Sequence, residues 1–234
     1  MLRTIAFDAD DTLWQNEHYY KISQARFASL LSDRADAAQV EKCLLEAEKR
    51  NIGRYGFGIK GFTLSMIETA LELSDGNADA AKIRDIIEIG REQLVHPVDL
   101  LPYARETIIL LESRYSLLLI TKGDLYDQER KIAQSGLGDY FDAIEVVSEK
   151  NAGTYDRLFK RHGAGTESSA MVGNSLKSDV LPAIECGGFG IYVPHELTWS
   201  YEHAAAPTND ARFREIAHLG ELPSTLDWIE AGYA

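Results

Sequence analysis

The stretch Thr4-Ile5-Ala6-Phe7-Asp8-Ala9-Asp10-Asp11-Thr12 decides the fold of this chain. Its apolar start predicts a short buried strand over residues 4–8, which ends at two carboxylates separated by one residue. Because side chains at i and i+2 of an extended chain point to one side, Asp8 and Asp10 should face the same spot beyond the strand end. Two like charges held that close are costly unless a cation or a shared proton relieves them. The pattern predicts a metal site, or chemistry in which one carboxyl attacks while the other carries a proton.

The composition favours a globular protein that acts on small molecules. The chain has 234 residues, enough for one large domain or a domain with an insertion, and it is 45% hydrophobic and 26% charged. A formal net charge of −13 argues against nucleic acid and against an anionic membrane as partners. A small anionic substrate stays compatible with this charge, because a metal and a few donors can reverse the field inside one cleft.

The two cysteines and the chain start contain no targeting or redox signal. Cys43 and Cys186 are far apart in segments of helical pattern, so neither a metal-binding spacing nor a disulfide framework is implied. Asp8 comes too early for a signal peptide, and no apolar stretch reaches the length of a membrane span. We expect a cytoplasmic enzyme or binding protein.

Five short apolar runs predict strands. They cover residues 4–8, 116–121, 143–147, 169–173 and 190–193. The second and fourth are almost continuously apolar, which is typical of strands covered on both faces. Helical patterns at 102–114, 125–135, 152–163 and 176–186 alternate with the later strands. This alternation predicts an α/β fold with a mainly parallel sheet and helices on both faces. Residues 204–225 are interpreted as loop-rich, followed by a short helix around 226–230.

Residues 16–100 interrupt the alternation. They carry apolar residues at helical spacing and no convincing strand. His96-Pro97 ends this stretch and Pro102 stands near the next helix start. The pattern predicts an all-helical insertion at 16–100 between the first two strands of a core formed by 1–15 and 101–234. Such an insertion should lie over the carboxyl ends of the strands, where ligands bind in open α/β sheets.

Four polar motifs follow ends of predicted strands. They are Asp8/Asp10, the stretch Thr121-Lys122-Gly123-Asp124, Lys150, and the stretch Gly173-Asn174-Ser175-Leu176-Lys177-Ser178-Asp179. In this order and spacing the chain resembles the haloacid dehalogenase-like (HAD) superfamily of hydrolases, in the branch with a helical cap inserted after the first strand. The resemblance implies a Rossmann-like core sheet with an all-helical cap.

The residue chemistry gives these motifs catalytic tasks. Ionised Asp8 can attack phosphorus without a general base, and Asp10 can protonate the leaving oxygen and later deprotonate water. Lys150 would neutralise Asp8 and the phosphoryl group. The Thr121 hydroxyl and the N–H groups of residues 122–123 can turn toward phosphate. Taken singly, each motif could also be a turn or a helix cap.

The resemblance assigns Thr121 to phosphoryl oxygens and shows two departures. Lys122, a candidate substrate-binding residue with Gly123, stands where Asn is common. Asn174 stands where an acid usually follows the glycine, while Asp179 is kept. We expect Mg²⁺ to be bound by an Asp8 carboxylate oxygen, by the Asp10 carbonyl and by Asp179 or Asn174.

Two other motifs are interpreted as decoys. Gly56-Phe57-Gly58-Ile59-Lys60-Gly61 matches a dinucleotide fingerprint, but a helical pattern precedes it instead of a strand. Arg54, Tyr55 and Lys60 of this region are candidate substrate-selecting residues of a cap loop, although a plain helix connection is as good an interpretation. His195-Glu196-Leu197-Thr198-Trp199 begins like a zinc-protease motif but has Trp199 where the second histidine must stand.

The resulting expectation is a Mg²⁺-dependent phosphatase that hydrolyses a small phosphorylated metabolite through an aspartyl-phosphate. Alternatives are a 2-haloacid dehalogenase, against which Asp10 argues, a phosphonatase, a phosphomutase, and a weakly active relative that only binds a phosphate ligand. The sequence leaves the metabolite open, and a monomer or a homodimer is expected.

Overall fold

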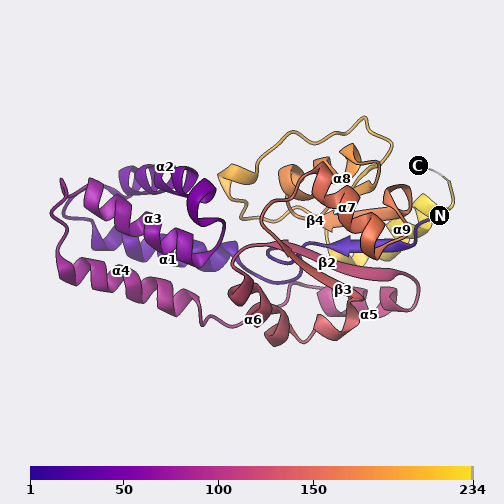
Figure 1. Ribbon diagram of the computed structural model, residues 1–234, viewed down its shortest axis with the longest axis horizontal. Coiled ribbons are helices and arrows are strands. Elements are labelled where there is room, and N and C mark those ends of the chain that lie inside the picture. Colours follow the sequence, from indigo (N-terminus) through magenta and orange to yellow (C-terminus); the bar gives the residue numbers. More distant parts are fainter. Residues whose placement is uncertain (233–234) are drawn as a thin grey trace. The chain divides into compact units, whose positions relative to one another are not determined.

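The protein divides into two compact units. The computed structural model describes residues 1–232 (Figure 1). One unit is an α/β unit made of Met1–Glu17, Val98–Lys122 and the chain from Glu129 onward. The other is a helical unit made of His18–Pro97 together with Gly123–Gln128. Each is described separately below.

The α/β unit is built on one six-stranded sheet in which every pairing is parallel. The order is β3-β2-β1-β4-β5-β6. The strands are β1 Thr4–Phe7, β2 Ser116–Lys122, β3 Ala143–Val147, β4 Ser169–Gly173, β5 Phe189–Tyr192 and β6 Phe213–Glu215. The prediction of a mainly parallel sheet is confirmed, and all five predicted strands are present. β6 was missed, so the interpretation of residues 204–225 as loop-rich was wrong in part.

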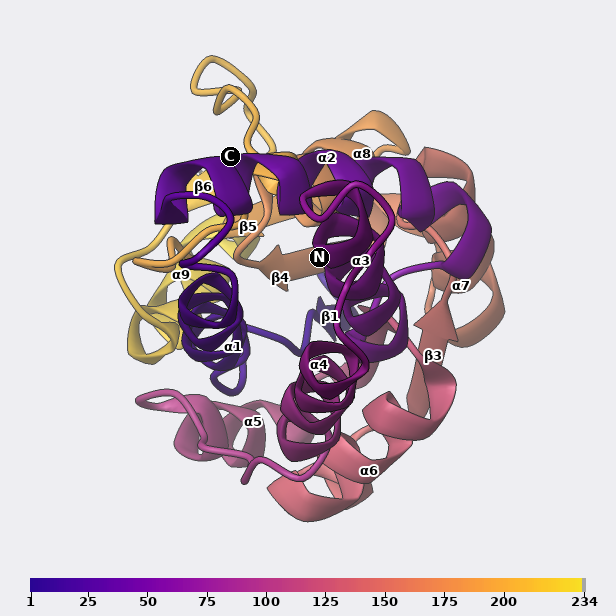
Figure 2. The same ribbon diagram turned by 90° about the vertical axis from the view of Figure 1, so that its left-hand side faces the viewer.

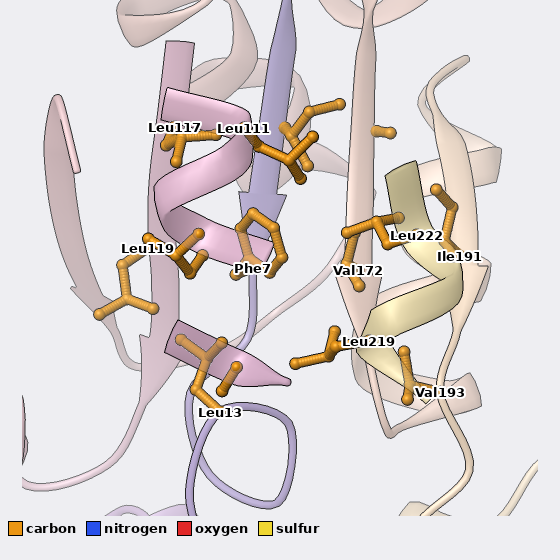
Figure 3. Close-up of a cluster of buried hydrophobic side chains, with 14 of the residues drawn as sticks. Phe7, Leu13, Leu111, Leu117, Leu119, Val172, Ile191, Val193, Leu219 and Leu222 are labelled. Carbon is orange, nitrogen blue, oxygen red and sulfur yellow. The ribbon is translucent and has the colours of Figure 1, made fainter. Parts of the chain in front are cut away.

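Burial on both faces explains why β1, β2 and β4 are so apolar. Phe7, Leu119 and Val172 share one register row and one buried cluster (Figure 3). Helices α5 (Ala104–Glu112) and α9 (Leu222–Glu230) contribute to that cluster. Helices α7 (Ala152–His162) and α8 (Leu181–Glu185) pack on the opposite face, against residues such as Leu118 and Met171. Burying such side chains contributes roughly 1.5–3 kcal/mol each. The central position of β1 therefore fixes the position of the carboxylates that follow it.

The helices of this unit occupy the stretches that the sequence pattern indicated. They are α5 Ala104–Glu112, α6 Leu125–Ser135, α7 Ala152–His162, α8 Leu181–Glu185 and α9 Leu222–Glu230. The first four residues of α6, up to Gln128, are part of the helical unit. α8 is preceded by a wider, π-type turn over Leu176–Val180. Asn151 caps α7, because its side chain accepts the N–H of Thr154 at 2.9 Å.

The helical unit contains four helices, all within the stretch predicted to be helical. They are α1 Glu17–Leu30, α2 Ala37–Tyr55, α3 Ile59–Glu72 and α4 Ala80–Gln93. Asp36 and Asp79 cap α2 and α4 by accepting backbone N–H groups. A separate buried cluster, which includes Phe27, Leu44 and Met66, holds them together. Figure 2 shows α1 and α4 nearly end-on, with α2 seen from the side above them.

The structure also gives the state of the two cysteines and the nature of the helices with respect to a membrane. Cys43 and Cys186 are free thiols. Across residues 1–232, no helix is both long enough and apolar enough to cross a membrane.

Candidate active site

The candidate site lies where β1 ends. The N–H of Asp8 donates to the Val172 carbonyl at 2.9 Å, so Asp8 still runs beside β4. The chain then turns sharply, because the Ala9 carbonyl accepts the N–H of Leu13 at 2.8 Å and Asp11 adopts a left-handed φ of 59°. Aspartate tolerates this conformation better than most residues. The turn keeps Asp8 and Asp10 close together at the sheet edge.

Asp8, Lys150 and Asp179 form a buried charge cluster. The Lys150 ammonium donates to Oδ1 of Asp8 and, at 2.7 Å, to Oδ1 of Asp179. All three side chains are at most 10% exposed. Burial, reinforced by the negative charge of Asp179, raises the pKa of Asp8 to about 7 despite Lys150. Although burial alone would lower it, the pKa of Lys150 is held above its usual value by Asp179 and Asp8. The lysine is therefore a permanent positive charge beside Asp8.

Asp179 reaches this cluster because the chain leaves room for it. Its Oδ2 accepts the N–H of Ser175 at 3.0 Å. A Cβ on Gly173 would lie only 2.3 Å from the same oxygen, so any larger residue there would displace the carboxylate. The Tyr155 hydroxyl donates to the Ser178 carbonyl at 2.9 Å and lies 3.5 Å from Oδ1 of Asp179. Both carboxylate oxygens of Asp179 thus already accept hydrogen bonds from protein groups.

Beside Oδ2 of Asp8, the side-chain amide of Asn174 and its neighbouring oxygen atoms form a group that we call the oxygen ring. One end of this amide lies 3.1 Å from Oδ2 of Asp8, 3.2 Å from the Asp10 carbonyl oxygen and 3.2 Å from Oγ1 of Thr12. The backbone N–H of Asn174 also donates to Oγ1 of Thr12 at 3.0 Å, which connects the loop after β4 to the loop after β1. If the amide oxygen occupies this place, it faces acceptors; if the amide turns over, its nitrogen donates to all three groups.

This ring has the chemistry of a Mg²⁺ site. Mg²⁺ prefers hard oxygen ligands and is usually held by only one or two carboxylates. With the Asn174 amide oxygen in this place, Oδ2 of Asp8, the Asp10 carbonyl oxygen and the amide oxygen have no hydrogen-bond donor between them. A cation bound among these three oxygens would take the place of that donor. Within residues 1–232, no group of three or more histidine, cysteine, aspartate or glutamate side chains is arranged to hold a metal. In this ring, only Asp8 offers a carboxylate oxygen, and the other two oxygens belong to an amide and a backbone carbonyl. The residues present therefore fit the ion.

The Asp10 carboxylate is held by two residues that the sequence analysis did not identify. Lys131 of α6 donates to both Asp10 oxygens at 2.7 Å, and the indole N–H of Trp14 donates to Oδ1 at 2.8 Å. Lys131 and Lys150 thus form ion pairs with three carboxylates, those of Asp8, Asp10 and Asp179. Lys131 lies in mid-helix, where no strand-end rule points to it.

Thr121 and Lys122 are the last two residues of β2, and Gly123 follows them. Thr121 is buried and paired with Val146 of β3. The Lys122 ammonium donates to Glu202 at 2.6 Å and to Ser178 at 2.7 Å. Gly123 has a φ of 148°, and a Cβ on it would meet the Gln128 side chain at 2.7 Å, so the turn requires glycine.

The other candidate residues lie in the helical unit. Arg54 and Tyr55 are exposed at the end of α2, and exposed Lys60 in the first turn of α3 forms an ion pair with Asp124 of the same unit at 2.9 Å. Gly56 follows α2 directly, so no strand precedes the glycine motif. In the α/β unit, Nε2 of His195 lies 3.8 Å from Asp11. Asp11 accepts the N–H groups of Asn16 and Glu17, and burial raises its pKa to about 6.

Comparisons with known proteins show which family the chain belongs to. The chain is 42% identical to a haloacid dehalogenase-like family hydrolase from Xanthomonas campestris, with a TM-score of 0.89 over 99% of this chain and 93% of that one. It is 27% identical, over 85% of its length and 88% of the relative, to a glyceraldehyde 3-phosphate phosphatase of Methanothermobacter thermautotrophicus. The HAD-hydrolase YfnB of Bacillus subtilis, solved bound to magnesium, has the same fold, with a TM-score of 0.66 at 18% identity over 96% of this chain and 98% of that one. Residues 2–187 match the haloacid dehalogenase-like hydrolases, and the chain belongs to this family of hydrolases.

Proposed function

We propose that this hydrolase is a Mg²⁺-dependent phosphatase that removes the phosphoryl group of a small phosphorylated metabolite. The observation that carries the proposal is the two-sided environment of Asp8. One carboxylate oxygen is held by Lys150, and the other belongs to the ring of oxygens formed with Asn174 and the Asp10 carbonyl. A nucleophilic carboxylate needs this division, because Oδ2 can be neutralised by the cation while Oδ1, beside Lys150, attacks phosphorus.

We propose Asn174 rather than Asp179 as the third protein ligand of Mg²⁺. The Asn174 amide lies at the ring, whereas the Asp179 oxygens accept hydrogen bonds from Lys150 and from the Ser175 N–H. Asp179 then serves to hold Lys150 in place. When bound, Mg²⁺ supplies positive charge against the phosphoryl oxygens and keeps Asp8 ionised. The magnesium-bound fold relative supports this choice of ion.

The residues of the site then account for two successive displacements at phosphorus. Oδ1 of Asp8 attacks the phosphorus atom, a new O–P bond forms and the bond to the leaving oxygen breaks. Asp10 gives its proton to that oxygen. Asp10 then takes a proton from water as the water oxygen attacks, which breaks the O–P bond to Asp8 and releases phosphate. Lys150 stabilises the charge on the transferring group, and Thr121 is proposed to orient its oxygens.

A small phosphorylated carbohydrate is the substrate class that we propose to test first. The named relative acts on glyceraldehyde 3-phosphate, and its match covers most of both chains. Lys122 and Gly123, where β2 ends, stay proposed substrate-binding residues, and Arg54, Tyr55 and Lys60 stay proposed substrate-selecting residues of the helical unit. We also propose a cytoplasmic location, since such metabolites are handled there.

The proposal is tested by hydrolysis of an aryl phosphate. Asp8→Asn keeps the size of the side chain but removes the nucleophile, so we expect turnover to fall by about 10⁴-fold or more. Chelation of divalent ions should abolish turnover of the unaltered protein, and Mg²⁺ should restore it. Asp139→Asn is the control, because Asp139 is exposed and distant in sequence from the motifs. Activity retained by Asp8→Asn would rule out the mechanism.

A further inference from the structure

Glu202 is a half-buried carboxylate that none of the steps above uses. It lies in the short helical turn Ser200–Glu202, between β5 and β6, and its side chain is only 12% exposed. Its Oε1 accepts the Lys122 ammonium at 2.6 Å. Its Oε2 accepts the hydroxyls of Ser175 and Ser178, at 2.6 Å and 2.5 Å. Each oxygen of this carboxylate therefore accepts from a different part of the sheet edge.

The groups that donate to Glu202 belong to two strand ends. Lys122 is the last residue of β2, and its ammonium also donates to Oγ of Ser178 at 2.7 Å. Ser175 and Ser178 belong to the loop after β4 that begins with Asn174 and ends with Asp179. Glu202 joins them from a third segment of the chain, so one side chain connects the ends of β2 and β4.

The same loop carries the proposed metal ligand. Oγ of Ser175 accepts the N–H of Ser178 at 2.9 Å, and the Ser175 N–H donates to Asp179. Asn174 is the residue immediately before Ser175. A shift of the Ser175 side chain therefore moves the peptide that joins it to Asn174, and with it the amide that faces Asp8 and the Asp10 carbonyl.

The positive charge of Lys122 and the serine hydroxyls keep Glu202 ionised, which favours a rigid connection between the ends of β2 and β4. Although burial alone would raise it, the pKa of Glu202 is held below its usual value by the Lys122 ammonium and by the hydroxyls of Ser175 and Ser178. Glu202 is thus an acceptor at both oxygens, and every partner that it has here is a donor. Glutamine cannot reproduce this arrangement, because one of its two terminal atoms donates.

We infer that Glu202 is a positioning residue, which holds the loop 174–179 against Lys122 and so sets the affinity of the Asn174 site for Mg²⁺. The inference rests on the proposed function for the identity of the ion. The inference also gives Lys122 a task other than substrate binding, because its ammonium is the group of β2 that Glu202 holds. The outer residues that orient a metal ligand typically change metal affinity about tenfold or more when they are replaced.

The test compares Glu202→Gln with Glu196→Gln. Both variants remove one negative charge from the segment between β5 and β6, but Glu196 is exposed. Amide hydrogen exchange of the metal-free proteins should be about tenfold faster over residues 174–180 in Glu202→Gln and unchanged in Glu196→Gln. Calorimetric titration with Mg²⁺, without substrate, should show about tenfold weaker binding for Glu202→Gln alone. Glu202→Asp, which keeps two accepting oxygens, should recover part of both losses.

The kinetic readout separates positioning from catalysis. At saturating Mg²⁺, Glu202→Gln should keep kcat within about threefold, while the Mg²⁺ concentration for half-maximal rate rises about tenfold. Equal exchange rates and equal Mg²⁺ affinity in the two glutamine variants would overturn the inference. If the unaltered protein itself failed to bind Mg²⁺, the proposed metal site would be wrong, and faster exchange confined to Glu202→Gln would still support the connection between the two strand ends.

Discussion

The ion pairs of the two units differ in burial. In the α/β unit, Lys150 and Asp179 have side chains that are 2% and 1% exposed. In the helical unit, Arg50 and Glu72 pair at 2.6 Å, but their side chains are 46% and 52% exposed. The geometry of the two pairs is similar, so the surroundings decide what each pair contributes. Buried pairs carry a large desolvation cost, whereas exposed pairs are screened by water.

The comparison teaches that a shifted pKa does not by itself identify a site. Burial raises the pKa of Glu48, in α2 of the helical unit, to about 7, similar to that of Asp8. Asp8, however, lies between a lysine and a ring of oxygen atoms at the end of β1. The convergence of charged groups at one sheet edge distinguishes Asp8 from Glu48.

The largest difference is expected between Lys150→Met and Arg50→Met. Removal of Lys150 leaves two buried carboxylates without their shared cation, so the free energy of unfolding should fall by about 3–5 kcal/mol and turnover by about 10³-fold. Arg50→Met should cost about 0–1 kcal/mol and leave turnover unchanged. Chemical denaturation and aryl phosphate hydrolysis measure both effects. Similar losses of stability in the two variants would contradict the distinction.

An intermediate effect is expected for Asp8→Asn in the presence of a chelator. The pKa of Asp8 rises from 3.8 to about 7 on folding, so the folded state prefers the protonated carboxyl. The metal-free protein should therefore lose stability as the pH rises from about 4 through about 7, and the neutral asparagine should remove this loss. At about pH 8 the variant should be more stable than the unaltered protein by about 1–3 kcal/mol. Urea denaturation across this pH range measures the difference, and a less stable variant would contradict the account.

The smallest effect is expected for Glu48→Gln. The half-buried Glu48 carboxyl has a pKa raised from 4.5 to about 7, so its contribution to stability is also lost as the pH rises through that range. The variant should gain about 1 kcal/mol at about pH 8 and nothing at about pH 4. Unlike Asp8→Asn, it should leave turnover unchanged. A gain that persists at low pH would show that packing, and not ionisation, is responsible.

Much of the fold could be predicted because buried parallel strands leave a strong signal. β2 and β4 are continuous apolar runs, and the motifs that follow them are easily located. β6 gave no such signal, because it has three residues and only Phe213 is buried. Its pairing with β5 comes from tertiary structure and not from a local pattern.

The candidate site could be predicted only where its residues follow strands. Asp8, Asp10, Lys150 and Asn174 lie together at the sheet edge, as the sequence analysis expected of strand ends. Lys131 and Glu202 could not be found in this way, since one lies in mid-helix and the other in a loop far along the chain.

The most direct measurement is the search for a phosphoryl group on the protein. The enzyme is mixed with substrate and Mg²⁺, quenched in acid within the first turnover, digested and analysed by mass spectrometry. The account predicts one added phosphoryl group on the peptide that contains Asp8, absent from Asp8→Asn and lost when the sample is made alkaline. Rapid turnover with no modified peptide at any quench time, or with the group on another residue, would contradict it.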